Sequence, residues 1–208
     1  MKVALISATK NTIEPIEKAF EIYAPDIEYI HILDSDLLKM MEKSGFLTDE
    51  MVDRFRDLCM LAVKSKVDVI QLTCSAFNDA VDVLRTIFHV PILRSDQAML
   101  DKALKYNKIG LVSTVKETPI ALCNYLKRRK PNIEIFSKVD DRAFQLLSQG
   151  KLEEHDYRVL SMVEGIQEKV DVIVLSQYSM EHVANQIVSR LPILTAAKET
   201  VLHLKSLS

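Results

Sequence analysis

One of the three cysteines in this sequence stands where a thiol could do chemistry. Cys74 follows the apolar run Val67–Thr73 and precedes a segment, from about Phe77, that is predicted to be helical. A thiol near a helix N-terminus lies close to the positive end of the dipole and to backbone N–H groups, which favour the thiolate. Cys74 is therefore predicted to be a nucleophile or a base. Cys59 and Cys123 share helical faces with apolar residues and are interpreted as packed hydrophobic side chains.

Hydroxyl and amide side chains follow two of the predicted strands. Thr9 and Asn11 come after the first strand, and Thr114 comes after a later strand of similar sequence. Such side chains, next to free amides at helix starts, bind carboxylates or phosphates well. The alternative is ordinary N-capping, which would account for Thr12 and Thr118 without a ligand.

The histidines and acidic runs predict no metal site. His155 falls in a charged helix start, and His182 lies near the loop after a later strand. His31, His89 and His203 lie in or beside predicted regular elements. The runs Asp34–Asp36 and Glu153–Asp156 are interpreted as solvated helix starts, and no carboxylate pair has the look of a metal or acid/base couple.

The elements that must position these residues follow an alternating pattern. Short β-branched runs alternate with amphipathic stretches, which is typical of βα units on a parallel sheet. The predicted strands are 3–7, 28–33, 67–73, 109–113, 133–136 and 171–176. The predicted helices begin and end at about 12–23, 48–65, 77–89, 95–106, 117–130, 152–169, 180–190 and 196–207. Near-continuous apolar strands suit sheets covered by helices on both faces.

An internal repeat runs through this pattern. KVALISATKNT at 2–12 recurs as KIGLVSTVKET at 108–118, with five identical positions. VDVIQLTCSAF at 67–77 recurs as VDVIVLSQYSM at 170–180, and VPIL at 90–93 recurs as LPIL at 191–194. Three blocks in the same order indicate a duplication rather than chance likeness between βα units.

The duplication predicts two similar three-layer α/β halves with parallel sheets, related by a pseudo-twofold axis. The first half comprises residues 1–97 with the C-terminal helix 196–208, and the second comprises 98–195; a crossover of the terminal segments between halves is left open. Ligands of open parallel sheets bind beyond the carboxyl ends of the strands. We therefore expect an active-site cleft between the halves, lined by the loops after equivalent strands.

Composition excludes several classes of protein. A formal net charge of −2 provides no basic footprint for nucleic acid. Four glycines leave no glycine-rich phosphate loop, and no apolar run has the length of a membrane span. Three widely spaced cysteines argue against a disulfide framework or a zinc site and favour a reducing cytoplasm. The sequence leaves open whether the protein forms a homo-oligomer.

The strand followed by Thr-Cys-Ser at 73–75 resembles the first catalytic cysteine motif of the aspartate/glutamate (hydantoin) racemase superfamily. IGLVSTVKET at 109–118 resembles the opening of that family's second half, whose threonine helps to hold a substrate carboxylate. The resemblance covers essentially the whole chain. It implies a cytoplasmic isomerase of the racemase/epimerase class that needs no metal or organic cofactor and acts on a small carboxylate substrate.

The chain departs from the family at the second catalytic cysteine. The corresponding stretch reads Leu-Ser-Gln-Tyr-Ser-Met at 175–180, and the repeat places Gln177 opposite Cys74. An amide does not titrate in the useful range, so two-base racemisation lacks one partner here. Gln177 can instead donate a hydrogen bond to a carboxylate or an enediolate.

The sequence leaves three hypotheses about the function open. A second base could be Tyr178 or His182; Cys74 could act alone in a cis–trans isomerase or a decarboxylase; or the chain could be a non-catalytic small-acid binder. The predicted catalytic residues are Cys74 and Gln177. The predicted substrate-binding residues are Ser7, Thr9, Asn11, Thr73, Ser75, Ser113, Thr114, Thr118, Tyr178 and Ser179.

Overall fold

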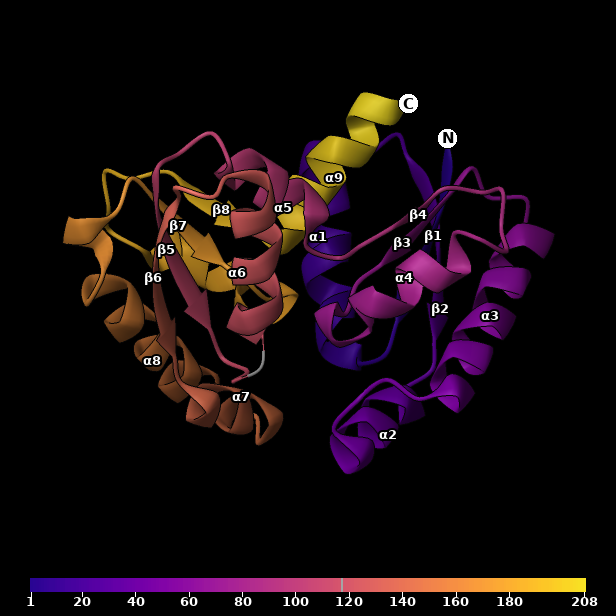
Figure 1. The fold of residues 1–208 in the computed structure, drawn as a ribbon, viewed down its shortest axis with the longest axis horizontal. Coiled ribbons are helices and arrows are strands. Elements are labelled where there is room, and N and C mark those ends of the chain that lie inside the picture. Colours follow the sequence, from indigo (N-terminus) through magenta and orange to yellow (C-terminus); the bar gives the residue numbers. More distant parts are fainter. Residues whose placement is uncertain (117) are drawn as a thin grey trace. The chain divides into compact units, whose positions relative to one another are not determined.

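Two parallel four-stranded sheets form the framework of the computed structural model, which describes residues 1–116 and 118–208 (Figure 1). The first sheet has the strand order β2-β1-β3-β4 and the second β6-β5-β7-β8. The strands are β1 (Lys2–Ser7), β2 (Glu28–Leu33), β3 (Val69–Leu72), β4 (Ile92–Leu93), β5 (Lys108–Ser113), β6 (Glu134–Val139), β7 (Val172–Leu175) and β8 (Ile193–Thr195). The predicted α/β class with parallel sheets is confirmed.

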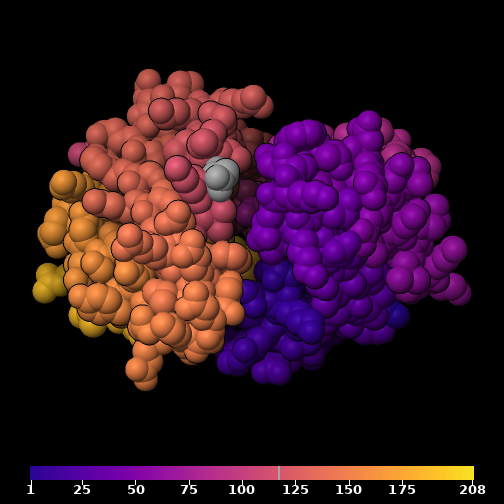
Figure 2. Space-filling view, turned by 90° about the horizontal axis from the view of Figure 1, so that it is seen from below, coloured from indigo at the N-terminus to yellow at the C-terminus, as the bar shows by residue number. Residues whose placement is uncertain are grey.

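The chain divides into two compact units, Met1–Gln97 with Val201–Ser208, and Ala98–Thr200. The prediction instead assigned all of 196–208 to the first half. Helix α9 (Ala196–Leu207) begins in the second unit and ends in the first. Figure 2 colours residues 1–97 of the first unit indigo to magenta, and residues in the orange range, where α7 and α8 lie, form much of the second unit's surface in that view.

The two sheets repeat each other in register as well as in order. β1 pairs with β2 and β3 at the same relative positions at which β5 pairs with β6 and β7. The Asp68 carboxylate accepts a hydrogen bond of 2.6 Å from the backbone N of Lys2, and Asp171 accepts one of 2.9 Å from that of Lys108. This repetition supports the internal duplication predicted from the sequence.

Helices flank both sheets. The helices are α1 (Ile13–Tyr23), α2 (Asp36–Ser44), α3 (Asp49–Lys64), α4 (Asn78–Leu84), α5 (Gln97–Ala103), α6 (Thr118–Arg129), α7 (Asp141–Ser148), α8 (Leu152–Glu164) and α9, with 3-10 helices η1 (Lys10–Thr12), η2 (Ser75–Phe77), η3 (Gln167–Lys169) and η4 (Tyr178–Gln186). Local signals set several ends: Thr48 caps α3 by accepting from the Met51 N–H, and Gly45, at φ 75°, ends α2. No described helix is long and apolar enough to cross a membrane.

The predicted helices differ most from the observed ones at α2, at α7 and over residues 180–190. Glu117, the first residue of the predicted helix 117–130, lies outside the described residues. α2 and α7 were not among the predicted helices. The predicted helix 180–190 is the 3-10 segment η4. Glu181, His182 and Gln186 of that segment all bond to other elements, so tertiary contacts override its local helical pattern.

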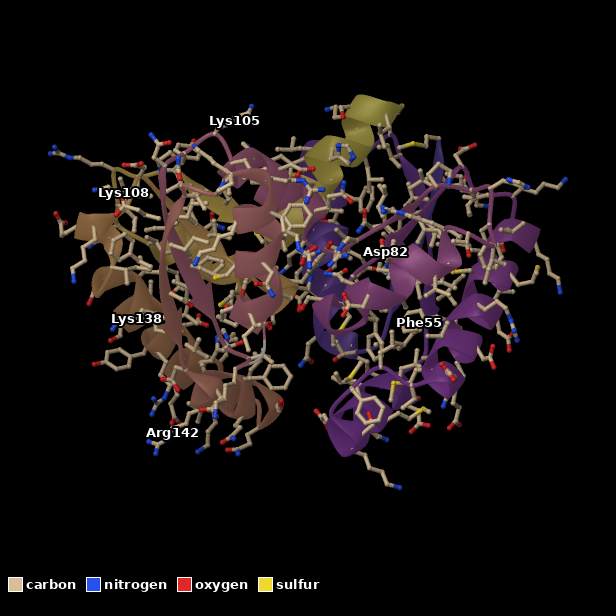
Figure 3. All side chains as sticks on the ribbon, in the orientation of Figure 1. Phe55, Asp82, Lys105, Lys108, Lys138 and Arg142 are labelled. Carbon is tan, nitrogen blue, oxygen red and sulfur yellow. The ribbon has the colours of Figure 1, made fainter. Side chains whose placement is uncertain are left out.

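Each sheet buries both of its faces. In the first unit, Ala4 and Ile6 of β1 belong to one apolar cluster with Phe55 and Cys59 of α3. Because side chains alternate along a strand, Val3 and Leu5 point to the opposite face and are also buried. Figure 3 shows Phe55 on α3 in the first unit, and the exposed Lys108 and Lys138 in the second.

Gly110 of β5 faces the α8 side of the second sheet, where there is no room for a larger residue. A Cβ at this position would lie 2.9 Å from Ile166 Cδ1 and 3.1 Å from Val170 Cγ2. Gly110→Ala should therefore lower the free energy of unfolding by about 1–2 kcal/mol through overpacking, measured by urea denaturation. Gly165→Ala is the matched control, because its nearest neighbour would be 3.5 Å away; equal losses in both variants would contradict the packing argument.

Candidate active site

Three hydroxyl groups meet at the carboxyl end of the first sheet. Ser7 Oγ lies 2.8 Å from Thr73 Oγ1, and Thr12 Oγ1 lies 3.0 Å from the same Thr73 oxygen. All three residues are buried. Thr12 makes no side-chain cap bond at the start of α1, so the N-capping interpretation is wrong for this residue. Its hydroxyl joins η1 to Thr73 at the end of β3, whereas the Ser7 hydroxyl joins the end of β1 to the same residue.

Capping does account for Thr9. Its Oγ1 accepts a hydrogen bond of 3.3 Å from the Asn11 backbone N–H and so caps η1. The Asn11 side chain is exposed, and Lys10 beside it is exposed as well. Thr9 and Asn11 therefore lie in the predicted loop, and their side chains are more exposed than the three buried hydroxyl residues.

Cys74 follows directly after this hydroxyl group and is half-buried. Burial raises the pKa of its thiol to about 11, although a hydrogen bond from the Ala76 backbone partly offsets the effect. The predicted preference for the thiolate is thus wrong. The helical run that starts here is the 3-10 turn η2 (Ser75–Phe77), followed directly by α4 (Asn78–Leu84), and its dipole does not outweigh the desolvation of the charged form.

A buried carboxyl group that the sequence analysis missed lies beyond the end of β4. Asp96 is 2% exposed, and desolvation raises its pKa to about 6 against the attraction of Arg94. Asn78, four residues after Cys74, holds the same turn: its Oδ1 accepts hydrogen bonds from the Ser95 N–H at 3.0 Å and from the Ser95 hydroxyl at 3.3 Å. The polar run directly after the apolar strand β4 was the feature of the sequence that could have indicated Asp96.

The second sheet carries the equivalent arrangement, with Gln177 in place of the cysteine. Ser113 Oγ lies 2.8 Å from Ser176 Oγ, as Ser7 lies from Thr73. Gln177 Oε1 accepts from the Ser176 hydroxyl at 2.9 Å and from the Thr114 N–H at 3.1 Å. Its Nε2 donates to Thr118 Oγ1 at 3.2 Å.

These bonds fix the Gln177 amide among three neighbours. The hydroxyl of Thr114 is buried and has no hydrogen-bond partner among the described residues. A buried hydroxyl without a partner is costly, and such groups are common where a ligand or water completes the site. The carboxyl end of the second sheet thus carries an amide fixed by hydrogen bonds, that of Gln177, and a hydroxyl without a partner among the described residues, that of Thr114.

Tyr178 and Ser179, the next residues, are both buried. The Tyr178 hydroxyl lies 2.9 Å from Thr200 Oγ1 of α9. Glu181 takes the position equivalent to Asn78 and accepts hydrogen bonds from the Thr195 hydroxyl at 2.6 Å and from the Ala197 N–H at 3.2 Å. The start of η4 is therefore anchored to β8 and α9.

The interpretation of Glu153–Asp156 as a solvated helix start is wrong at its last two residues. Asp156 is 8% exposed and His155 is 0% exposed. Because α8 packs against η4, Asp156 is enclosed by His155, His182 and Gln186. Burial alone would raise the pKa of Asp156, but the hydrogen bonds from these three residues outweigh it and lower that pKa.

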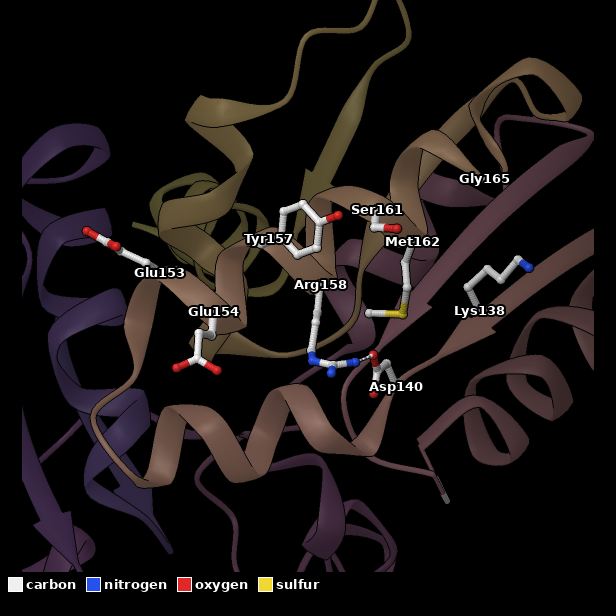
Figure 4. Close-up of a pocket in the computed structure, with 9 residues that line it drawn as sticks. All are labelled: Lys138, Asp140, Glu153, Glu154, Tyr157, Arg158, Ser161, Met162 and Gly165. Carbon is white, nitrogen blue, oxygen red and sulfur yellow. Dashed lines mark hydrogen bonds and ion pairs between the residues drawn. The ribbon is translucent and has the colours of Figure 1, made fainter.

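An open hollow of about 530 Å³ lies on the other side of α8 (Figure 4). Arg158 donates a hydrogen bond of 2.7 Å to Asp140 across it. The first unit has the same kind of pair, Arg54 with Asp34, so Arg158 and Asp140 belong to the repeated framework. The rest of the lining is mostly polar, apart from the buried Met162, and comes from Lys138, Glu153, Glu154, Tyr157, Ser161, Met162 and Gly165.

Several solved structures with a similar architecture are racemases. The aspartate racemase of Picrophilus torridus superposes with a TM-score of 0.76 at 15% identity, over 99% of this chain and 93% of its own. The chain has the fold of the aspartate/glutamate racemases. The allantoin racemase of Klebsiella pneumoniae has a TM-score of 0.68 at 17% identity, over 100% and 87% of the two chains.

A glutamate racemase of Francisella tularensis, solved with D-glutamate, has a TM-score of 0.70 at 13% identity and covers 99% of this chain and 80% of its own. No protein-family model and no curated protein sequence matched this chain. The racemase fold is thus established by structure, at sequence identities that leave the reaction to be argued from the residues themselves.

Proposed function

We propose that this protein is a racemase/epimerase-like enzyme that exchanges the α-proton of a small carboxylate substrate, with Cys74 as its acid/base. The observation that carries the proposal is the pair of equivalent strand ends. At each end, a hydrogen-bonded pair of hydroxyl groups directly precedes one functional side chain, which is Cys74 in the first unit and Gln177 in the second. Racemase-fold neighbours support the reaction class.

Each proposed residue has a role that suits its chemistry. The Cys74 thiol can give or take a proton at carbon. Gln177, held by Ser176 and Thr118, can donate its remaining Nε2 hydrogen to a carboxylate or enediolate oxygen as negative charge develops. The free Thr114 hydroxyl can bind the substrate carboxylate. We propose Ser7, Thr9, Asn11, Thr73, Ser75, Ser113, Tyr178 and Ser179 as the surrounding substrate-binding or supporting residues.

A second candidate reaction is decarboxylation, in which Cys74 protonates the resulting carbanion on one face. It is favoured by the raised pKa of Cys74, which keeps the thiol protonated at neutral pH, and by the absence of a titrating group at Gln177. A thiol that starts protonated is suited to giving a proton before it accepts one.

Incubation with amino acids, hydantoins and dicarboxylates in D₂O tests the proposal. We expect deuterium at the α-carbon of at least one compound, read by NMR and chiral chromatography. Deuterium with retained configuration indicates one working acid/base, whereas inversion requires a second one besides Cys74. Release of CO₂ with deuterium in the product supports decarboxylation. No exchange, isomerisation or CO₂ from any compound would contradict an enzymatic role.

A further inference from the structure

Two histidines and an aspartate meet inside the second unit, on elements that the proposed reaction does not use for proton transfer. His155 and Asp156 lie in the early turns of α8, and His182 lies on η4. His155 Nδ1 is 2.8 Å and His182 Nε2 is 2.7 Å from the same oxygen, Asp156 Oδ1. The two imidazole rings are stacked, with centroids 5.7 Å apart.

The three side chains offer two imidazole nitrogens and one carboxylate oxygen within 4.8 Å of one another. Around a tetrahedral zinc ion, with bonds of about 2.0–2.2 Å, ligand atoms stand roughly 3.3 Å apart. Contacts of 2.7–2.8 Å would therefore lengthen by only about half an ångström to admit the ion. Two nitrogens and one oxygen select first-row transition metals over Mg²⁺ or Ca²⁺, which prefer oxygen ligands.

Burial and incomplete bonding separate this group from an ordinary surface ion pair. The His155 side chain is fully buried, and its Nε2 has no hydrogen-bond partner among the described residues. A buried polar cluster with an unsatisfied member costs stability and is usually kept for a function. The Gln186 amide, 2.7 Å from Asp156 Oδ2, orients the carboxylate as an outer-shell group does around a metal.

We propose that His155, Asp156 and His182 form a binding site for one divalent transition-metal ion of the zinc class. Three protein ligands leave a fourth position for water or a ligand, which is the pattern of reactive or exchangeable sites rather than closed structural ones. The His182 side chain is 34% exposed and provides a path for the ion to enter. The proposal departs from the sequence-based expectation of no metal, and it does not rest on the proposed reaction.

Cobalt titration of the full-length, tag-free chain tests this site directly. The protein is first stripped with a chelator, and Co²⁺ is then added while visible absorption is recorded. We expect one equivalent of Co²⁺ per chain, d–d bands of nitrogen and oxygen coordination, and stoichiometric displacement of the cobalt by Zn²⁺. The same zinc addition should raise the melting temperature, and the chelator should reverse that rise.

Variants locate the ion. His182→Gln and Asp156→Asn should each weaken Co²⁺ binding by roughly 100-fold or more, because each removes one of three ligands. His89→Gln is the matched control, since His89 is exposed and lies in the first unit; it should bind as the unaltered protein does. His182→Gln is the preferred variant, because this partly exposed side chain is the least needed for packing, and circular dichroism checks that it folds.

Three results would overturn the proposal. One is no Co²⁺ uptake by the stripped protein. Another is unchanged uptake in a folded His182→Gln variant. The third is an intense thiolate-to-cobalt charge-transfer band that disappears with Cys74→Ser or Cys123→Ser, which would assign the ion to a cysteine instead.

Discussion

Replacing Cys74 with alanine should lower turnover by about 10²–10⁴-fold, the usual contribution of a positioned acid/base group. Substrate affinity should change little, because the proposed carboxylate contacts come from hydroxyl and amide groups rather than from the thiol. The measurement is deuterium exchange or product formation, with ligand binding followed separately by calorimetry. An unchanged rate would remove Cys74 from the mechanism, and retained binding with no turnover in the unaltered protein would favour a small-acid binding protein.

Cys123→Ala is the matched control for this experiment, because Cys123 is a free and half-buried thiol on α6. It should leave the rate unchanged. Alkylation adds an independent reading of Cys74. With the pKa of the Cys74 thiol near 11, its thiolate fraction and alkylation rate should rise about tenfold per pH unit from pH 7 to pH 10. A rate that is already level at pH 8 would contradict the raised pKa.

Replacing Asp96 with asparagine should remove a loss of stability that the unaltered protein shows as pH rises through about 6. The folded-state pKa of Asp96, about 6, lies above the value of 3.8 for an exposed aspartate. The unaltered protein therefore loses stability as pH rises through this range, because its buried carboxyl group must become charged. A difference of about 2 pKa units corresponds to about 3 kcal/mol between pH 3.5 and pH 7.5. Asp96→Asn lacks this loss.

Urea denaturation of both proteins at a series of pH values measures the effect. The quantity compared is how the difference in unfolding free energy between the two proteins changes with pH. Any effect of altered hydrogen bonding by the asparagine is the same at every pH and therefore cancels. Asp26→Asn replaces an exposed carboxylate and should follow the unaltered protein throughout. A difference between Asp96→Asn and the unaltered protein that does not change with pH would show that Asp96 is charged at little cost.

The repeat made much of the fold predictable. β5 aligns with β1 by residue pairs such as Lys2 with Lys108, and the sheet pairings follow the same offset. Periodic apolar residues are a local property of the chain, so the strands and most helices could be found without tertiary information. The same offsets placed Gln177 in the position equivalent to Cys74, where the bond between Ser113 and Ser176 matches the bond between Ser7 and Thr73.

Burial decided the rest. The sequence placed Cys74 near a helix start but did not show that the helix begins with a 3-10 turn or that desolvation raises the pKa of the thiol to about 11. The contact of His182 with Asp156 joins residues 26 positions apart in the chain. From the sequence, Asp156 was predicted to be part of a solvated acidic run.

The physical reason is the same in each case. Element types and their order depend on periodicity within each segment, which the amino-acid sequence contains directly. The charge state of a side chain and the partners of a buried polar group depend on which distant elements cover it, because desolvation and hydrogen bonding are set by packing. The sequence alone thus determined the repeated α/β halves and the place of Cys74 and Gln177, whereas only the tertiary structure revealed the burial of Cys74, the hydrogen bonds of Gln177 and the contacts of Asp156 with the two histidines.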